Sequence, residues 1–556
     1  MSAPPAYWPR VTGRATRSRR GYIGVVVPDS EQDLAAAAPG PDRDTAAWRR
    51  QVLIAAACLG LVALLYVGYL RQSQTLAADA DGASNVLQAW DMLHGNLLLS
   101  GWRLSDVSFY TTELPEYMLA DLVRGLSPAV ISTAGAATYT ILLVLTAMAA
   151  RGRACGALGL SRVLVAAGIM LAPGPGYGAS SLLSSPDHTG TGVPLVLTWL
   201  AIDRLGGRRY LPWLAGALLT WAEIADQLAI YAGALPVVVV AVIRLARRRP
   251  TWRADAALLA AAAVSVPLGM GMTLLIRQAG GYTVASVPLT LATWGEVPGH
   301  LQLAGQSLLN LFGASFTGLT SWPEIVFAAL HLAGLILAAW ACWLAARRLL
   351  AADDWLVPLL FTGIVISLAG FTFSTQAIDP GSTHELVAVL PFAAALAGRL
   401  IPGRRALTVL APVLLVVLAG YGAALGWNAA GPAQPPAVQP VASWLTAHRL
   451  TAGLGNYWIS NITTVATGGR VTVRPVVLSC GRFIPDAWES RQSWYTPPAT
   501  ATFLVLSQSA ASGPAQASAQ FGAPEQTATV GGYEVLIWRH DLLPALASGT
   551  AAGCGT

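Results

Sequence analysis

The dominant feature of this sequence is a series of apolar runs, most of them long enough to cross a lipid bilayer as a helix. A transmembrane helix needs about 20 apolar residues, and charged residues make up only 11% of the chain, whereas soluble domains carry about a quarter. The sequence therefore predicts an all-α polytopic membrane protein with about 11 transmembrane helices. The predicted spans are residues 52–70, 128–149, 162–180, 191–205, 210–224, 226–246, 255–276, 324–346, 355–374, 384–400 and 406–427.

The placement of arginine predicts how these spans are oriented. Alternate connections are rich in arginine, and the positive-inside rule places such connections in the cytoplasm. Residues 1–50 are then a disordered cytoplasmic tail, and an odd number of spans places the C-terminus outside the cytoplasmic (plasma) membrane. Because the basic residues sit at the ends of spans, no nucleic-acid partner is expected. The arginines concerned are Arg49, Arg50, Arg151, Arg153, Arg204, Arg208, Arg209, Arg244, Arg247, Arg248, Arg249, Arg347, Arg348, Arg404 and Arg405.

The outer face is predicted to carry the unusual segments. The transmembrane body, residues 51–427, has two long outer loops, 71–127 and 277–323, and loops of this length are commonly functional. Residues 428–556 follow a Pro-rich linker with helical and strand-like patterns, which predicts a small extracytoplasmic α+β domain. Two cysteines of this region, Cys480 and Cys554, share the oxidising side, so a disulfide between them is allowed.

The first outer loop opens with "LAADADGASN", in which Asp79 and Asp81 are one residue apart. Apolar residues after Asn85 fall on one face of a helix that would lie along the membrane surface. A second short helix is predicted near Pro115. One interpretation of the two aspartates is functional; the other is a solvated loop in which Asp81 or Ser84 caps the first surface helix.

This layout resembles the glycosyltransferase C (GT-C) superfamily of polyprenyl-phosphate-sugar-dependent enzymes. The resemblance rests on "DADG" at Asp79–Gly82, "AWDMLHGN" at Ala89–Asn96 and "SSPDHTG" at Ser184–Gly190. It implies an inverting transfer of sugar from a polyprenyl-phosphate donor to a cell-envelope glycan, lipid or protein, among membrane lipids. Such a reaction needs a base, and Asp81 is the first candidate because Gly82 beside it would let a sugar approach. Asp79 is the second candidate.

The resemblance also implies substrate-binding residues elsewhere on the outer face. Asp187 resembles a metal or acceptor-sugar ligand, with a helix cap as the alternative, and the adjacent His188 could bind sugar or phosphate. The remaining candidates are Asp226, Glu113, Arg277 and His384. His384 stands where the family often has a phosphate-binding arginine, and Arg277 is otherwise explained by snorkelling. The residues alone indicate no metal site, although a divalent cation, Mg²⁺ or Mn²⁺, fits the resemblance.

The alternative function is a transporter or flippase of lipid-linked envelope precursors. Such a protein would place its ionisable residues near the middle of the membrane, whereas an outer-face transferase would place them at the outer ends of the helices. The depth of the ionisable cluster therefore distinguishes the two functions.

Overall fold

The computed structural model describes residues 41–184, 188–286, 290–349, 354–401, 404–508 and 513–546. The described residues up to Leu61 belong to one unit, and the chain from Val62 onward forms a second unit, which contains every feature below except the first part of α1. Residues 1–40 of the predicted tail and Cys554 lie outside the described residues, so the disorder of residues 1–40 and the Cys480–Cys554 disulfide stay predictions. Residues 41–50 of the predicted tail are instead helical, because α1 begins at Pro41, ahead of its apolar run.

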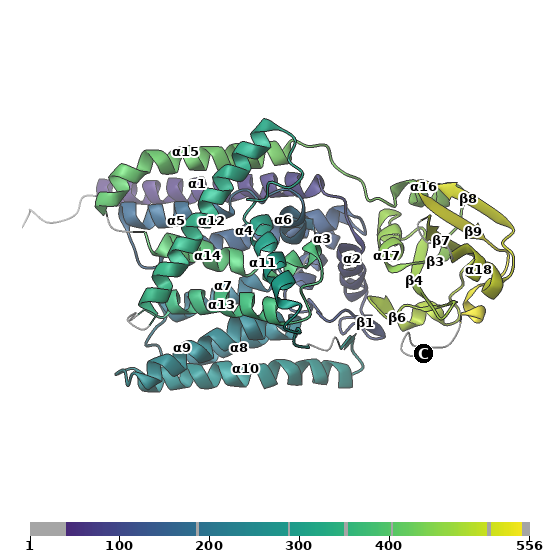
Figure 1. Ribbon diagram of the computed structural model, residues 1–556, viewed down its shortest axis with the longest axis horizontal. Coiled ribbons are helices and arrows are strands. Elements are labelled where there is room, and N and C mark those ends of the chain that lie inside the picture. The colour runs from purple at the N-terminus through teal and green to yellow at the C-terminus, as the bar shows by residue number, and fades with distance from the viewer. Residues whose placement is uncertain are drawn as a thin grey trace, which may run out of the picture. The chain divides into compact units, whose positions relative to one another are not determined.

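A bundle of helices makes up most of the second unit (Figure 1). Each predicted apolar run overlaps one of its helices. These are α1 (Pro41–Gln74), α4 (Ala129–Arg151), α5 (Gly156–Met170), α7 (Gly192–Arg204), α8 (Leu211–Ala225), α9 (Leu235–Ala246), α10 (Trp252–Gln278), α12 (Trp322–Arg348), α13 (Leu356–Phe373), α14 (Val389–Arg399) and α15 (Arg404–Ala429). Among the described helices, six are long and apolar enough to cross a membrane: α1, α4, α10, α12, α13 and α15. The multi-pass membrane character is therefore as predicted, while the number of eleven spans stays a prediction.

The short helix α14 explains why apolar runs overestimate the spans. Its residues from Val389 to Gly398 are all buried, and it packs against α4, α5, α12 and α13. Trp199 of α7 meets Phe392 of α14 edge-on at 5.9 Å between ring centroids. The apolar run of α14 reflects burial within the protein. A sequence pattern alone does not distinguish such burial from burial in lipid.

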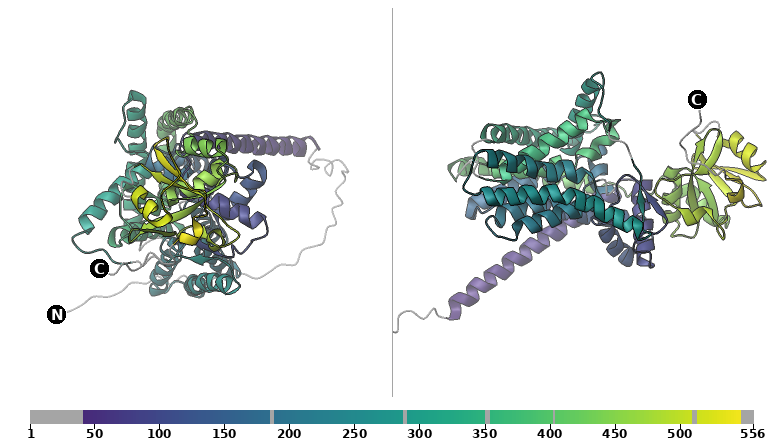
Figure 2. Two further views of the ribbon diagram at one scale, coloured as in Figure 1. Left: turned by 90° about the vertical axis from the view of Figure 1, so that its right-hand side faces the viewer. Right: turned by 90° about the horizontal axis from the view of Figure 1, so that it is seen from below.

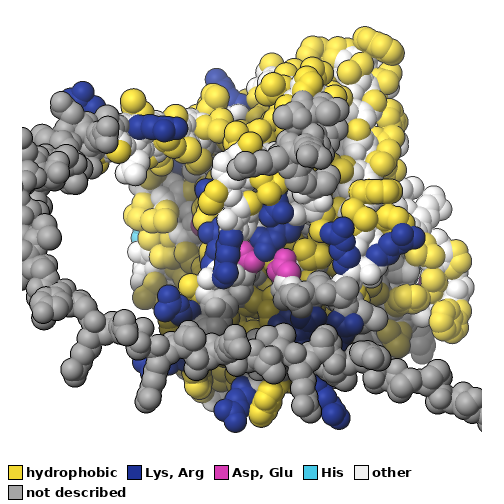
Figure 3. Space-filling view, turned by 90° about the vertical axis from the view of Figure 1, so that its left-hand side faces the viewer, with side chains coloured by type: hydrophobic (Ala, Val, Ile, Leu, Met, Phe, Trp, Pro, Cys, Tyr) yellow, Lys and Arg dark blue, Asp and Glu magenta, His cyan; other side chains and the backbone are white. Residues whose placement is uncertain are grey.

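The arginine-rich connections meet at one end of the bundle. Arg399 pairs there with Asp203 at 2.6 Å and with Asp354 at 3.3 Å. Arg153 donates to the carbonyl of Asp203 at 3.1 Å, which brings the α4–α5 connection to the same place. Figure 3 shows this end, where Arg side chains gather among hydrophobic ones.

The first outer loop contains helices in both predicted places and a short strand, but most of α2 is buried within the protein, so a position along the membrane surface stays a prediction. Helix α2 (Ala80–Leu93) follows the first span, and α3 (Glu113–Arg124) begins two residues before Pro115. Strand β1 (Trp102–Leu104) lies between them and pairs with β2 (Thr283–Val284) in parallel and with β6 (Ser490–Arg491) in antiparallel orientation. The second long loop adds α11 (Val297–Leu311).

The C-terminal region forms a mixed six-stranded sheet in the order β5-β4-β3-β7-β9-β8, in green and yellow in Figure 2. Parallel pairing of β3 with both β4 and β7 makes the centre of the sheet, and a turn at Gly531 and Gly532 joins β8 to β9. Helix α17 of this region packs against α2. The elements are β3 (Ala452–Gly455), β4 (Thr472–Ser479), β5 (Arg482–Pro485), β7 (Phe503–Ser507), β8 (Gln526–Val530), β9 (Tyr533–Ile537), α16 (Gln439–Ala447), α17 (Tyr457–Ala466) and α18 (Gly513–Phe521).

Candidate functional site

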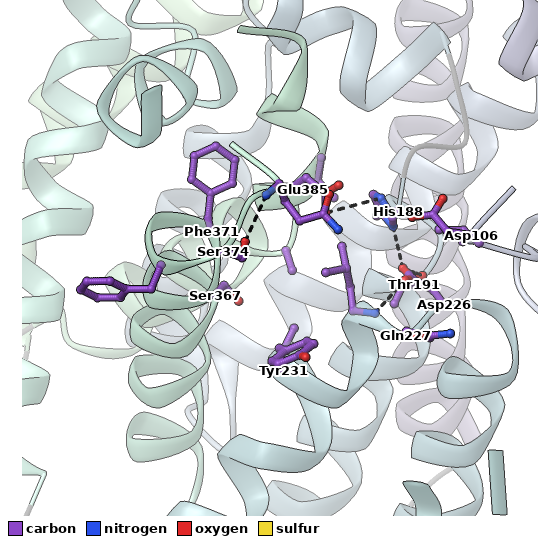
Figure 4. A pocket seen from close by; sticks show the side chains of 18 of the residues that line it. Asp106, His188, Thr191, Asp226, Gln227, Tyr231, Ser367, Phe371, Ser374 and Glu385 are labelled. Atoms are coloured by element: carbon purple, nitrogen blue, oxygen red, sulfur yellow. Dashed lines mark hydrogen bonds and ion pairs between the residues drawn. The ribbon is translucent and has the colours of Figure 1, made fainter. Parts of the chain in front are cut away.

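A cavity of about 420 Å³ lies where several helices end. Its walls come from the start of α7, the connection after α8, the end of α13, the 3₁₀ turn η3 (Pro380–Leu386) and both long outer loops. Ionisable residues of four of these segments line it, namely Asp106, His188, Asp226 and Glu385. In Figure 4, Asp106, His188 and Asp226 lie together and Glu385 faces His188.

Asp226 anchors the cavity wall. It ends α8 and is 2% exposed. One carboxylate oxygen, Oδ2, accepts hydrogen bonds from His188 Nδ1 at 2.8 Å and Thr191 Oγ1 at 2.7 Å, while Oδ1 accepts from the amide of Leu228 at 2.8 Å. Burial raises the pKa of Asp226, but the charge of His188 and these hydrogen bonds outweigh it and hold the pKa below its usual value. An ionised Asp226 fixes the proton of His188 on Nδ1, so that Nε2 is the nitrogen left to act on a ligand.

Glu385 of η3 lines the opposite wall, and His384 lies next to it without being among the described residues that line the cavity. Asp379 caps the start of this turn and Pro380 is its first residue, so the turn begins as an element of its own between α13 and α14. Glu385 Oε2 lies 3.9 Å from His188 Nε2, and Glu385 Oε1 lies 3.5 Å from His384 Nε2. Burial raises the pKa of Glu385, but the hydrogen bond with His384 and the two histidine charges lower it below its ordinary value. His384 is a candidate binding residue from the sequence, whereas Glu385 is not, because only the fold brings Glu385 to His188.

These three side chains form a donor set that fits a divalent cation. Ligand atoms of His188, His384 and Glu385 all lie within 4.8 Å of one another. Two imidazoles and one carboxylate suit Zn²⁺ or Mn²⁺ better than Mg²⁺, which prefers oxygen ligands. The Asp226 hydrogen bond to His188 Nδ1 is the outer contact that metal-bound histidines commonly have.

Glu113 supports the turn that carries His188. Its Oε1 accepts the amide proton of Gly190 at 2.9 Å, and a Cβ on Gly190 would lie 2.4 Å from the Glu113 carboxyl carbon. His188 itself has a left-handed backbone, with φ of 58°, which is uncommon outside glycine and needs such support. Burial raises the pKa of Glu113 to about 8. Glu113 thus positions His188 without lining the cavity.

Asp106 is the acidic residue of the first outer loop that lines the cavity. The amides of Ser108 and Phe109 donate to the carbonyl of Ala225 at 2.9 and 3.1 Å, which fixes this stretch beside Asp226. Burial raises the pKa of Asp106, His188 lowers it, and the neighbouring carboxylates of Glu385 and Asp226 raise it further, so the net pKa is raised. Asp106 is not predicted from the sequence, because the stretch "LSDVS" carries no signal for a functional residue except its place in a long outer loop.

The structure places the two predicted catalytic aspartates away from the described cavity lining. Asp79 caps α2, where its Oδ1 accepts the amide proton of Gly82 at 3.0 Å. Asp81 Oδ1 accepts the hydroxyl proton of Tyr457 at 2.5 Å. A Cβ on Gly82 would lie 2.9 Å from Ile131, so this glycine permits close packing of α2 on α4 and not the approach of a sugar.

The two further candidates from the sequence, Arg277 and Asp187, are not among the four ionisable residues described above as lining the cavity. Arg277 is exposed in the last turn of α10 and is not among the described residues that line the cavity. Asp187 lies outside the described residues, although its neighbour His188 lines the cavity.

No protein-family model and no curated protein matches this sequence. Among solved structures, the apo state of ArnT from Cupriavidus metallidurans is similar over 91% of this chain and 100% of that one, with a TM-score of 0.50 and 15% identity. ArnT bound to undecaprenyl phosphate is similar over 90% of this chain and 99% of that one, with a TM-score of 0.48 and 13% identity. An oligosaccharyltransferase of Archaeoglobus fulgidus, tethered to an acceptor peptide, is similar over 80% of this chain and 68% of that one, with a TM-score of 0.43 and 10% identity.

The likeness to apo ArnT extends over nearly the whole of both chains, and it shows that this chain shares the fold of that structure. The multi-pass membrane character agrees with the described helices that are long and apolar enough to cross a membrane.

Proposed function

We propose that this protein is a membrane glycosyltransferase that moves a sugar from a polyprenyl-phosphate donor to a cell-envelope glycan, lipid or protein. One observation carries the proposal: in a GT-C fold, a cavity at the ends of the helices gathers Asp106, His188, Asp226 and Glu385 beside an apolar wall. Leu195, Leu291 and Phe371 belong to that wall and suit a lipid carrier, while the ionisable groups suit a sugar phosphate.

Asp106 is the proposed base. The acceptor hydroxyl oxygen attacks the anomeric carbon, its proton passes to the Asp106 carboxylate, and the bond from that carbon to the phosphate oxygen breaks. Attack opposite the leaving group inverts the anomeric centre. The raised pKa of Asp106 makes its carboxylate a better proton acceptor than an ordinary aspartate. Asp81, the first candidate from the sequence, becomes the rival base, and its bond to Tyr457 argues against it.

His188 and His384 are proposed to face the phosphate of the departing carrier. Asp226 stabilises a protonated His188, and an imidazolium donates charge-assisted hydrogen bonds to a phosphate. If a divalent cation is present, His188, His384 and Glu385 would hold it, and it would neutralise the negative charge that develops on the leaving phosphate. Arg277 and Asp187 remain proposed contacts at the outer surface.

The proposed reaction takes place on the outer face, with the N-terminus in the cytoplasm and the C-terminal region outside. The arginine-rich connections support this orientation, because the positive-inside rule places them in the cytoplasm. The position of the cavity at helix ends also favours transfer over transport. Asp226 and His188 flank the end of α8 and the start of α7, whereas a transporter would hold them near mid-helix.

The test is a transfer assay with purified protein in lipid nanodiscs. Radiolabelled polyprenyl-phospho-hexoses and polyprenyl-phospho-pentoses are supplied with a cell-envelope acceptor fraction. We expect label to move to the acceptor with the wild-type protein and to fall by about 100-fold or more with Asp106→Asn. Glu525→Gln, an exposed carboxyl of the C-terminal region, is the matched control and should behave as wild type.

Two results would overturn the proposal. One is no transfer by the wild-type protein with any of these donors, combined with their protein-dependent translocation across liposomes. The other is a full rate with Asp106→Asn together with loss of transfer in Asp81→Asn, which would move the reaction to the start of α2.

A further inference from the structure

The C-terminal region reaches the cavity through a three-stranded sheet. Strands β1 and β2 are parallel, and the carboxyl ends of parallel strands meet at one edge. The cavity residues Asp106 and Ser286 are each the second residue after one of these two strands. The two turns are joined where the amide of Ala285 donates to the carbonyl of Ser105 at 3.0 Å. Strand β6 from the C-terminal region forms the other edge of β1.

Glu489, the residue before β6, binds the turn that carries Asp106. Its Oε1 accepts the amide proton of Ser105 at 2.8 Å, and its Oε2 accepts a hydrogen bond from the side-chain amide of Gln88 on α2. Ser105 in turn donates through its hydroxyl to the carbonyl of Val107 at 2.8 Å. The Glu489 carboxylate therefore binds the residue next to the proposed base, and Glu489 is not among the described residues that line the cavity.

The backbone of Glu489 is held in an uncommon conformation to make this contact. Its φ is 48°, in the left-handed region, and its side chain is 4% exposed. Asn461 donates through Nδ2 to the carbonyl of Glu489 at 3.0 Å and to the hydroxyl of Ser84 at 2.9 Å. A buried carboxylate with neutral donors is a costly way to pack two regions together, and such strain is typical of functional sites.

We propose that Glu489 is a positioning residue of the transferase site, and that it acts by holding the Ser105–Asp106 turn in the geometry that proton transfer needs. This inference rests on the proposed function. The turn then has two anchors: the carbonyl of Ala225 at the end of α8, and the carboxylate of Glu489 from the C-terminal region. The C-terminal region is thus part of the catalytic unit and not an appendage.

Two substitutions of Glu489 separate positioning from packing. Glu489→Gln keeps an oxygen that can accept from the Ser105 amide, so it should retain activity close to that of the wild type. Glu489→Ala removes that acceptor and should lower kcat about tenfold or more, with the KM for the polyprenyl-phosphate donor within about twofold. Rates are normalised to folded protein, and Glu534→Gln on β9 is the control from the same region. If Glu489→Ala does not fold, Glu489→Asp replaces it, since the shorter side chain keeps the charge but lacks the reach.

A double substitution tests whether Glu489 acts through Asp106. If it does, Asp106→Asn combined with Glu489→Ala should be no slower than Asp106→Asn alone. Losses that multiply, or a kcat of Glu489→Ala within twofold of wild type, would overturn the inference. Failure of the proposed function looks different, because the wild-type protein itself would then show no transfer.

Discussion

The first outer loop contains two acidic regions whose partners differ. At the start of α2, Asp79 is occupied by a helix amide and Asp81 by the hydroxyl of Tyr457. Twenty-five residues after Asp81, Asp106 lines an open cavity together with Asp226 and Glu385. The position of an aspartate in a loop is therefore a weak guide to its chemical role. The acidic motif nearest the first span makes hydrogen bonds within the fold, whereas the isolated Asp106 faces the cavity that a substrate would occupy.

The largest expected effect separates the two regions directly. Asp106→Asn should lower the transfer rate by about 100-fold or more, because it removes the proton acceptor. Asp81→Asn should lower it by less than about threefold, since an amide oxygen can still accept from Tyr457. The assay of labelled envelope acceptor measures both. The reverse order of effects would show that the start of α2 is the reacting site.

The next largest effect concerns the hydrogen-bonded pair of Asp226 and His188 in the cavity wall. Asp226→Asn should lower activity by about 10- to 100-fold, because His188 loses the carboxylate that fixes its tautomer and stabilises its charge. Thr198→Val, which changes a buried hydroxyl of α7 bonded to the carbonyl of Pro194, is a control for disturbance of the helix. Equal activity of the two variants would remove the Asp226–His188 pair from the mechanism.

A smaller effect appears as a dependence of stability on pH. Burial raises the pKa of Glu113 to about 8 from 4.5, so between these values the folded state holds a proton that the unfolded state has released. The free energy of unfolding therefore falls as the pH rises through this window. Thermal melting at pH 5 and pH 8 should show a smaller decrease for Glu113→Gln than for wild type. Identical decreases would mean that Glu113 does not titrate in this range.

The smallest effect belongs to the helix cap. Asp79→Ala should lower the free energy of unfolding by about 1 kcal/mol, because the amide of Gly82 loses its acceptor. Transfer activity per folded molecule should stay at the wild-type level, measured beside Asp79→Asn, which keeps a capping oxygen. A loss of turnover without loss of stability would return Asp79 to the catalytic candidates.

The sequence predicts the helices well because helices in lipid and helices buried in protein both lack charge. The sequence predicts the ends of these helices less well where a capping residue or a proline starts a separate turn. The predicted span 384–400 begins only at Val389, since Asp379 and Pro380 start a separate turn that carries His384 and Glu385 to the cavity. The expectation of two surface helices after the first span agrees with α2 and α3, whose apolar faces and Pro115 are visible locally.

The site is less predictable, because its members come from five separate segments. His188 and Asp226 are both candidates from the sequence, but their hydrogen bond depends on how α7 and α8 pack. Asp106 and Glu489 carry no local signal at all. Their contact through Ser105 joins residues 384 positions apart, and no motif spans such a distance.

That same contact has a consequence for biogenesis. The ribosome must complete the chain through Glu489 before the turn at Ser105 gains its second anchor, and in the proposed orientation the C-terminal region must also cross the membrane first. On the proposed function, a protein still being inserted would have its helices and its cavity but would lack this anchor of the Asp106 turn. Its transfer rate would reach the full value only after Glu489 has been added and the C-terminal region has folded against β1.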